Sequence, residues 1–272
     1  GIPPIHEEGL TEALRDSLEA GNLSFTDDLP EGIAGAAAVF CAVGTPEMAD
    51  GSADMRFVYK VAEDVGSLIT EYTVFVNKST VPVGTAKAVR NLISEQTETE
   101  FDVVSNPEFM AEGVALRDVR RPSRIVIGST SERAKDVMAE LYNPYVRNGR
   151  PIRYMSEVSA ELTKYGANGY LAAKVSFYNE LATLARLTGA DIEDIRVAMG
   201  DDPRIGNQFN YVSPGWGGSC FPKDSRSLIH IGEQYGFDFK VMRAADEAND
   251  EKVKELPKNV IDYFNGDIAG KR

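Results

Sequence analysis

The stretch Ala36-Ala37-Ala38-Val39-Phe40-Cys41-Ala42-Val43-Gly44-Thr45-Pro46 decides how the first half of the chain folds. It is a continuous apolar run that ends in the turn-forming tetrapeptide Val43-Gly44-Thr45-Pro46. A short apolar run without polar alternation is typical of a strand buried on both faces, as in parallel sheets. We therefore predict a strand over residues 37–43, with Cys41 as a small hydrophobic residue of the core.

Strand-like and helix-like runs alternate around this stretch, from about Gly35 to Gly128. The patterns predict strands at 37–43, 73–76, 101–104 and 124–127 and helices at 55–69, 85–95 and 132–142. This alternation predicts an α/β fold with a parallel, doubly wound, Rossmann-like sheet. Polar motifs follow three of the strands, at 43–46, 77–84 and 105–109, and the carboxyl ends of parallel strands meet at one edge. We therefore expect the three motifs to converge on one ligand crevice.

After Pro151 the pattern becomes helical. Apolar spacing predicts one helix over 156–189, about 50 Å long, which ends at Gly189. Further helices are expected at 191–199, at 225–235 and from Val241 onward, with a glycine- and proline-rich loop over 201–224. The long helix would connect the sheet domain to a helical second domain or form a dimer seam.

Composition limits the class of protein. The 272 residues have a net charge of −13, which argues against nucleic acid as a partner. No apolar run reaches 18 residues and no signal-peptide pattern opens the chain, so we expect a soluble, cytoplasmic protein without a membrane partner. The two cysteines lie in such different settings that a disulfide framework is not expected.

A dinucleotide fold normally opens with a strand, a Gly-x-Gly-x-x-Gly turn for the pyrophosphate and an acidic residue for the ribose. This sequence has neither the turn nor the acidic residue. Its first ten residues read like a connector between a second strand and the next helix, and residues 268–272 end where another strand could begin. We therefore expect the 272-residue chain alone to fail to bind NAD⁺ at micromolar concentration.

The segment Gly215-Trp216-Gly217-Gly218-Ser219-Cys220-Phe221-Pro222-Lys223-Asp224 carries the most chemical information. Cys220 lies in a glycine-rich turn, with the cation of Lys223 three residues on and the carboxylate of Asp224 four residues on. A thiolate attacks carbonyl carbon and is stabilised by a neighbouring ammonium, so this setting predicts a nucleophile. The alternative is an inert buried cysteine, a type that prefers apolar strands and helices.

Five other residues are candidates that are weak when taken singly. Lys164 and Asn168 stand four apart on one face of the predicted long helix and can point a cation and an amide at the same atom, although such residues are usually solvated. Glu108 and Thr80 follow predicted strands at the ligand edge, and Arg204 alone reads as an ordinary loop arginine.

Read together, five ordered segments closely resemble the UDP-glucose 6-dehydrogenase family, within the wider group of UDP-glucose/GDP-mannose dehydrogenases. The segments are Lys78–Thr85, Ser105–Gly113, Arg121–Gly128, Ala160–Asn168 and Gly217–Asp224. The resemblance runs from about Gly1 to about Asn265. It implies an NAD-binding domain at 1–150 that lacks its first β-α-β unit, an all-α central and dimerisation domain at 151–266, and the start of a missing UDP-binding domain at 267–272.

The resemblance also implies the reaction, a four-electron oxidation of the C6 alcohol of UDP-glucose to UDP-glucuronate, as used in polysaccharide biosynthesis, with two NAD⁺ and no metal. Cys220 would carry the thiohemiacetal and thioester, and the other implied catalytic residues are Lys164, Asn168, Asp224, Thr80 and Glu108. The implied cofactor-side residues are Val43, Thr45, Ser79, Thr80, Glu112 and Lys223. The implied substrate-side residues are Glu108, Phe109, Lys164, Asn168, Arg204, Phe209, Gly217 and Phe221.

Two matters stay open at the level of sequence. The run Ser213-Pro214-Gly215-Trp216 is shorter than in many bacterial relatives, so a UDP-N-acetylhexosamine or GDP-mannose remains an alternative substrate. In the family the arginine that matches Arg204 reaches the substrate of a neighbouring subunit, which implies a homodimer or a higher homo-oligomer. A chain of this length could instead be a truncated, non-catalytic core or dimerisation fragment.

Overall fold

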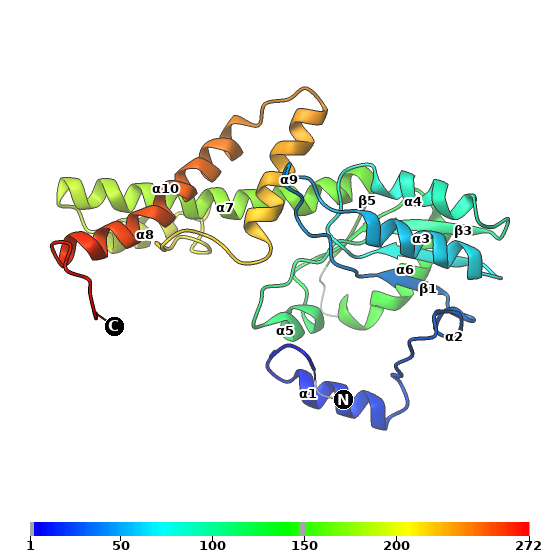
Figure 1. Ribbon diagram of the computed structural model, residues 1–272. Helices are drawn as coiled ribbons and strands as arrows, with labels where there is room; N and C mark the ends of the chain where they lie inside the picture. The colour runs from blue at the N-terminus through cyan, green and yellow to red at the C-terminus, as the bar shows by residue number, and fades with distance from the viewer. Residues whose placement is uncertain (1–2, 147–150, 272) are drawn as a thin grey trace. The chain divides into compact units, whose positions relative to one another are not determined.

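The computed structural model describes residues 3–146 and 151–271 (Figure 1). They form two compact units, the first made of Gly1–Pro46 with Asp54–Lys164 and the second of Glu47–Ala53 with Tyr165–Arg272. The predicted domain boundary at residue 150 and the predicted terminal positions Gly1 and Arg272 lie outside the described residues.

The first unit is an α/β unit built on a five-stranded sheet in the order β1-β2-β3-β4-β5. Its strands are β1 (Ala38–Cys41), β2 (Thr73–Asn77), β3 (Phe101–Ser105), β4 (Ile125–Gly128) and β5 (Ile152–Met155). Its helices are α1 (Leu10–Glu19), α2 (Leu29–Ile33), α3 (Arg56–Leu68), α4 (Thr85–Ser94), α5 (Ala115–Arg120) and α6 (Glu132–Val146).

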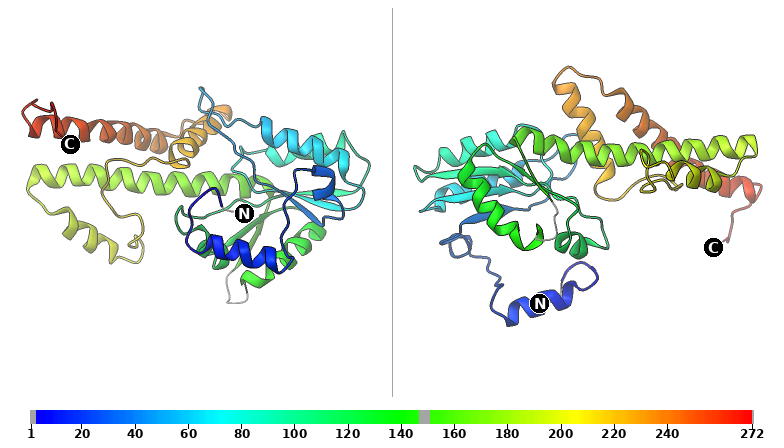
Figure 2. Two further views of the ribbon diagram at one scale, coloured as in Figure 1. Left: turned by 60° about the horizontal axis from the view of Figure 1, so that its bottom comes forward. Right: turned by 180° about the vertical axis from the view of Figure 1, so that it is seen from behind.

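Helices cover both faces of this sheet, as the doubly wound prediction requires (Figure 2). On one face Phe75 and Val103 pack in a core with side chains of α3 and α4. On the other face Val74 and Val76 pack in a separate core with Ala134 and Met138 of α6. The alternation along β2 follows from the period of two in a strand, and it explains why β2 is buried at every position.

Two expectations about the sheet are wrong. β1 pairs with β2 alone among the described strands, so it lies at an edge, and Phe40 is 42% exposed although Cys41 is buried as predicted. β4 runs antiparallel to β3, with Ser105 paired to Gly128, whereas β4 and β5 are parallel. The segment between β3 and β4 holds only the short helix α5, and the two strands pair through their last residues.

The parallel order of β1, β2 and β3 is confirmed, and this is the part of the sheet on which the predicted crevice depends. The segments after these strands are joined by hydrogen bonds. Thr45 Oγ1 donates to the carbonyl of Thr80 at 2.8 Å, Ser79 Oγ to the carbonyl of Val43 at 2.6 Å, and Lys78 Nζ to Asn106 Oδ1 at 3.1 Å. The three motifs therefore meet at one edge, as expected.

The second unit is helical. It contains the part of α7 (Glu157–Thr188) from Tyr165 onward, together with α8 (Ile192–Gly200), α9 (Phe221–Gln234) and α10 (Lys240–Tyr263). At 1.5 Å per residue the 32 residues of α7 span about 48 Å, close to the predicted length. The loop Glu47–Ala53 belongs to this unit because Ser227 Oγ of α9 donates to the Gly51 carbonyl at 3.2 Å.

The start of α9 differs from the prediction, which placed it at Ser225. The helix begins at Phe221, with Pro222 in its first turn and the amide of Asp224 donating to the Cys220 carbonyl at 2.8 Å. Proline suits the first turn because its missing N–H would have no partner there. Cys220 is consequently the N-cap residue rather than a residue in the middle of a loop.

No helix within residues 3–146 and 151–271 combines the length and the apolar character that a membrane crossing requires.

The contact of β4 with the first turn of α7 gives a test of the fold. A Cβ added to Gly128 would lie 2.5 Å from Ala160 Cβ and 2.9 Å from Glu157 Cα, so backbone must move to admit it. We expect Gly128→Ala to lower the free energy of unfolding by about 1–3 kcal/mol in urea denaturation. Gly166→Ala is the matched control, because it lies in α7 with nothing within 4 Å of the added Cβ. It should raise stability by up to about 1 kcal/mol, and equal effects of the two variants would contradict this packing.

Candidate active site

The site residues of the first unit centre on an ion pair between Lys164 and Glu108. Lys164 Nζ donates to Glu108 Oε1 at 2.6 Å, and the two side chains are 5% and 24% exposed. Glu108 Oε2 accepts the amide of Met110 at 2.7 Å. Both carboxylate oxygens are therefore engaged, which fixes the side chain at the carboxyl end of β3.

The ring of Phe109 makes cation–π contacts with two side chains. Its ring centroid is 5.6 Å from Lys164 Nζ and 3.8 Å from the guanidinium carbon of Arg124. Cations over an aromatic face are attracted by its quadrupole, so the ring orders both side chains. A cavity of about 320 Å³ opens beside these groups. Its lining is Lys78, Asn106, Pro107, Glu108, Phe109, Met110, Asp118, Val119, Arg121, Pro122, Ser123, Arg124, Ile125 and Tyr142.

Glu161 explains why Lys164 is held at this edge. It is a buried residue of α7, and its carboxylate accepts the amides of Gly84 and Ala86 at 2.6 and 2.8 Å and the hydroxyl of Ser105 at 3.3 Å. A carboxylate at the start of α4 also suits the positive end of that helix. Burial raises the pKa of Glu161, while these hydrogen bonds lower it. Glu161 thereby joins α7 to the start of α4 and to the end of β3.

Five of the six residues predicted for the cofactor side occupy the loops after β1, β2 and β3, and the sixth, Lys223, lies in α9 of the second unit. Val43, Thr45, Ser79 and Thr80 are joined by the hydrogen bonds described above, which order the two loops against each other. Glu112 is exposed in the segment between β3 and α5. The structure thus brings four of these residues together at the ligand edge.

The site residues of the second unit centre on Asp224. This carboxylate is 1% exposed, and it accepts hydrogen bonds from Asn168 Nδ2 and from Lys223 Nζ, both at 2.6 Å. A buried carboxylate stays charged most easily when it is paired and hydrogen-bonded, and Asp224 also lies in the first turn of α9. Asn168 follows Lys164 on α7 by four residues, which is close to one helical turn.

Cys220 is a free, partly exposed cysteine four residues before this carboxylate in sequence, at the N-cap of α9. A helix N-terminus carries a partial positive charge and exposed backbone N–H groups. Its sulfur lies 3.5 Å from Ser219 Oγ. The ammonium of Lys223, which the sequence associated with the thiol, is paired with Asp224.

Aromatic residues flank the nucleophile candidate. The rings of Phe209 and Phe221 are 6.0 Å apart and edge on, and Phe209 has a φ of 62°. A bulky residue in the left-handed region is strained and persists where its surroundings force it, which is a common feature of ligand sites. The exposed side chain of Arg204 bonds Asp202, with Nη2 to Oδ2 at 2.6 Å.

The loop before Cys220 is anchored by Trp216. Its indole N–H donates to Ser176 Oγ at 2.8 Å, and its backbone N–H donates to Asn249 Oδ1 at 2.7 Å. Gly215 has a φ of 122°, and a Cβ there would lie 2.7 Å from the side chain of Val253. The backbone that leads to Gly217 and Cys220 therefore depends on α7 and α10.

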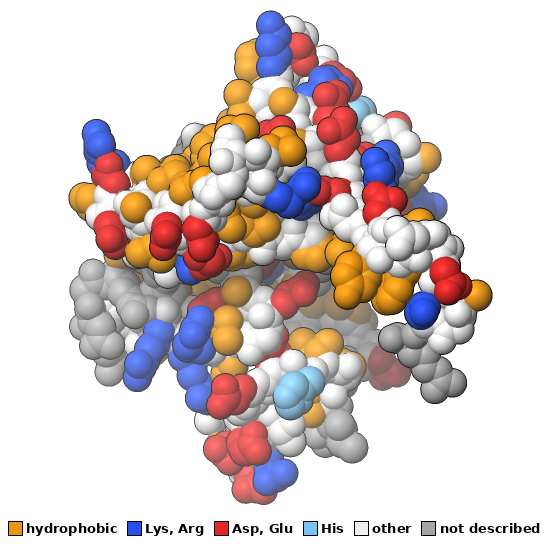
Figure 3. All heavy atoms as spheres, turned by 90° about the vertical axis from the view of Figure 1, so that its left-hand side faces the viewer, with side chains coloured by type: hydrophobic (Ala, Val, Ile, Leu, Met, Phe, Trp, Pro, Cys, Tyr) orange, Lys and Arg blue, Asp and Glu red, His pale blue; other side chains and the backbone are white. Residues whose placement is uncertain are grey.

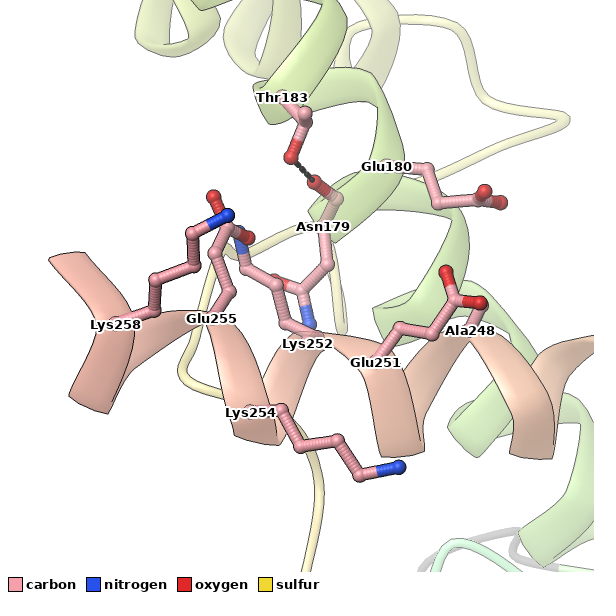
Figure 4. Close-up of a pocket in the computed structure, with 9 residues that line it drawn as sticks. All are labelled: Asn179, Glu180, Thr183, Ala248, Glu251, Lys252, Lys254, Glu255 and Lys258. Atoms are coloured by element: carbon pink, nitrogen blue, oxygen red, sulfur yellow. Dashed lines mark hydrogen bonds and ion pairs between the residues drawn. The ribbon is translucent and has the colours of Figure 1, made fainter.

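A second cavity, of about 400 Å³, lies between α7 and α10 (Figure 4). It is lined by Asn179, Glu180, Thr183, Ala248, Glu251, Lys252, Lys254, Glu255 and Lys258. Asn179 also accepts the Ser213 amide at 2.8 Å, so the wall of this cavity supports the Trp216 loop. None of the predicted site residues lines it.

Sequence reasoning missed Glu161, Asn106 and Lys78 as functional candidates. All three lie inside the sequence segments already singled out, and two features of the sequence indicate that they are functional candidates. Lys78 and Asn106 directly follow buried strands, and Glu161 is a carboxylate in an otherwise apolar helical stripe.

Comparison with known proteins assigns both parts of the chain to domains of one family. Residues 1–146 match the NAD-binding domain of the UDP-glucose/GDP-mannose dehydrogenase family, and residues 158–251 match the central domain of that family. The chain is 46% identical over 276 residues to the UDP-glucose 6-dehydrogenase of Pseudomonas aeruginosa, which covers 100% of this chain and 61% of the relative. It is 40% identical to the corresponding enzyme of Rhizobium meliloti, with 63% of that protein covered.

Solved structures are similar as well. A UDP-glucose dehydrogenase from the hyperthermophilic archaeon Pyrobaculum islandicum aligns with a TM-score of 0.88 and 41% identity over 92% of this chain and 58% of that one. A GDP-mannose dehydrogenase from Pseudomonas aeruginosa aligns with a TM-score of 0.72 and 31% identity over 92% of this chain and 59% of that one. The chain thus spans about three fifths of the length of these relatives.

Proposed function

The chain belongs to the UDP-glucose/GDP-mannose dehydrogenase family, and we propose that the natural full-length protein oxidises UDP-glucose to UDP-glucuronate through a covalent intermediate on Cys220. NAD is the cofactor of its first domain. The observation that carries the proposal is the buried Asp224, bound by Asn168 and Lys223, one turn into the helix that Cys220 caps.

The reaction balances as one alcohol, two NAD⁺ and one water giving one carboxylate, two NADH and three protons. NAD⁺ accepts one hydride in each of the two oxidations. Between them the Cys220 thiolate adds to the aldehyde carbon and forms a C–S bond, so the aldehyde is retained as a thiohemiacetal. Loss of the second hydride gives a thioester. Water then adds to its carbonyl, the C–S bond breaks, and the carboxylate and the thiol are released.

Charged and polar groups of the chain supply the remaining chemistry. The ammonium of Lys164 is a compact donor for the oxyanions that develop at C6, with the amide of Asn168 and an ordered water assisting. Asp224, whose carboxylate accepts hydrogen bonds from Asn168 and Lys223, would act with Thr80 on this water as a base. Glu108 would assist hydrolysis of the thioester, and its carboxylate is held by Lys164 and by the Met110 amide.

The residues present fit the nicotinamide end of NAD. Hydroxyls of Thr45 and Ser79 order the loops at the carboxyl ends of β1 and β2, which is where ligands bind to such sheets. Val43, Thr45, Ser79 and Thr80 would line the cofactor, with Glu112 and Lys223 nearby.

The substrate side would be formed by Phe109, Phe209, Gly217 and Phe221 together with the catalytic residues. The strained backbone of Phe209 and the anchored Trp216 loop support a preformed surface for the sugar nucleotide. UDP-glucose is favoured by the 46% identity to a UDP-glucose 6-dehydrogenase, against 31% for the GDP-mannose dehydrogenase.

The exposed side chain of Arg204 and the exposed apolar residues of α7 support a homodimer. Tyr170, Phe177, Leu184 and Leu187 are large α7 side chains that are more than half exposed, and the space-filling view shows hydrophobic side chains at the surface among acidic ones (Figure 3). Monomers rarely leave so many apolar groups in water, so a second copy would cover them. Arg204 would then reach the substrate of the partner.

The full-length protein should form two NADH for each UDP-glucuronate, because both oxidations occur before release. The measurement is parallel NADH absorbance and product chromatography, with UDP-N-acetylglucosamine and GDP-mannose as competing substrates. We expect kcat/KM for these two sugars to be at least about tenfold lower, equivalent to about 1.4 kcal/mol. A ratio of one NADH per sugar, or a preference for another nucleotide sugar, would refute the proposed reaction.

A further inference from the structure

Lys78, directly after β2, holds its ammonium on two neutral groups. Its Nζ donates to Asn106 Oδ1 at 3.1 Å and to the hydroxyl of Tyr142 at 3.2 Å, and it lies 5.7 Å from the centroid of the Tyr142 ring. Neither acceptor carries a formal charge. The charge of Lys78 is therefore not neutralised by its own hydrogen bonds, unlike that of Lys223, which is paired with Asp224.

The neutral acceptors are themselves fixed. Asn106 is 1% exposed, and its Nδ2 donates to the Val126 carbonyl at 2.7 Å, so Oδ1 must face Lys78. The Tyr142 hydroxyl donates to the same Oδ1. Burial raises the pKa of Tyr142 to about 12, so the hydroxyl stays neutral at the pH of any ordinary assay. The ammonium of Lys78 is thus held by two uncharged side chains, Asn106 after β3 and Tyr142 of α6, and Asn106 is in turn bonded to β4.

The charged groups that change the pKa of Lys78 are Glu108 and Lys164, which form the ion pair described above. Burial lowers the pKa of Lys78 to about 8, the Glu108 carboxylate raises it, and the Lys164 ammonium lowers it. Asp118, Arg121 and Arg124 line the same cavity. Asp118 is engaged by the Ala111 amide and Arg117, and Arg124 lies over Phe109. Lys78 and Glu108 therefore line one cavity, and the pKa of Lys78 depends on the charges of Glu108 and Lys164.

The Lys164 ammonium cannot stabilise both the Glu108 carboxylate and an oxyanion of the substrate fully at the same time. Lys164 is 2.6 Å from Glu108, and in the proposed reaction it must also face an oxyanion. When Lys164 turns toward that oxyanion, the carboxylate loses its cation in a site that is mostly shielded from water, where an unpaired charge is disfavoured. A second cation with a fixed position would offset this loss.

We propose that Lys78 is a positioning residue for Glu108: its ammonium, held by Asn106 and Tyr142, keeps the Glu108 carboxylate ionised while Lys164 stabilises the oxyanion. The inference rests on the proposed function for its role in turnover, but the electrostatic coupling can be measured without any reaction.

The first experiment follows the ¹³Cε signals of the lysines by NMR during a pH titration, with Lys78 assigned by its loss in Lys78→Met. The Lys78 midpoint should be near pH 8, fall by about one pH unit in Glu108→Gln, and rise in Lys164→Met, because these changes remove an anion and a cation respectively. A midpoint near 10.5 that neither substitution moves would overturn the proposal. This outcome does not depend on whether the protein is a dehydrogenase.

The second experiment measures kcat and KM for UDP-glucose against pH in the full-length protein. In Lys78→Met the acid limb of kcat should move up by about one pH unit, with KM changed less than about twofold. Lys78→Arg should restore most of this shift, and Lys87→Met, an exposed lysine of α4, should match the wild type. An unshifted acid limb in Lys78→Met would refute the role in turnover. If coupling is seen by NMR but the wild type oxidises no nucleotide sugar, the coupling stands and the proposed function fails.

Stability separates this role from a structural one. Because the pKa of Lys78 is lowered from 10.5 to about 8, the unfolded chain binds more protons between these values, and the free energy of unfolding rises with pH there. Below about pH 8 the folded protein carries a disfavoured ammonium. Lys78→Met should therefore be as stable as the wild type or more stable at pH 7 in urea denaturation. A marked loss of stability would indicate a structural lysine and count against the proposal.

Discussion

The Cys220→Ser variant of the full-length protein is expected to form uronate at least about 10³-fold more slowly than the wild type. A serine hydroxyl cannot supply the anion that a thiol supplies near neutral pH, so the covalent adduct with the aldehyde is lost. The first oxidation uses no thiol and should continue. Rapid-quench analysis with a carbonyl trap should then show aldehyde and one NADH per sugar, with little acid.

Cys41→Ala is the matched control for this variant, because Cys41 is the other cysteine and its side chain is buried at the end of β1. The loop after β2 bonds the backbone carbonyl of Cys41, which the substitution keeps. It should retain the wild-type ratio of acid to NADH, even if the loss of a buried side chain lowers stability. Acid formation by Cys220→Ser at the wild-type rate would rule out Cys220 as the nucleophile.

The sequence predicted the ligand edge because its signals are local. Apolar runs such as 73–77 bury both faces of a strand, and polar motifs after them must lie at the carboxyl edge if the strands are parallel. Within each unit the predicted residues do meet. Glu108, Phe109 and Lys164 lie together in the first, and Asn168, Asp224 and Lys223 in the second.

The direction of β4 could not be predicted from its own residues. Residues 125–128 are a four-residue apolar run, which fits a parallel or an antiparallel neighbour equally well. The direction depends on where the segment after Ser105 lies in space, and α5 is too short to give a helical signal. The helices α1 and α2 and the strand β5 were missed as well, and β5 has only four residues.

The partners of the buried polar residues were also beyond sequence reasoning. Glu161 contacts residues about 55 to 77 positions away, and Lys78 contacts Tyr142 at a separation of 64. Such pairs form through tertiary packing, and the spacing of residues in the sequence does not reveal them. Buried polar groups nevertheless need hydrogen-bond partners. A charged residue directly after a buried strand, such as Lys78, therefore indicates that such a partner exists, although it does not identify the partner.

The Lys164→Met variant should lower kcat by about 100-fold or more, equivalent to about 3 kcal/mol, while KM for UDP-glucose changes much less. A donor aimed at charge that develops during reaction acts mainly on the transition state, so its loss appears in kcat. Methionine is similar in length to the lysine stem and keeps its packing in this 5%-exposed position. Steady-state kinetics of the full-length protein measure both constants.

Lys164→Arg should not restore turnover, because a planar guanidinium cannot reproduce the compact ammonium that Glu108 holds at 2.6 Å. Lys60→Met on α3, whose exposed ammonium pairs only with a surface carboxylate among the described contacts, controls for loss of one positive charge. It should leave kcat within about twofold of the wild type. If Lys164→Met kept the wild-type kcat and merely unfolded at a lower urea concentration, the ion pair with Glu108 would be structural. The oxyanion would then need another donor, and the amide of Asn168, four residues on along α7, is the candidate that the proposed function names.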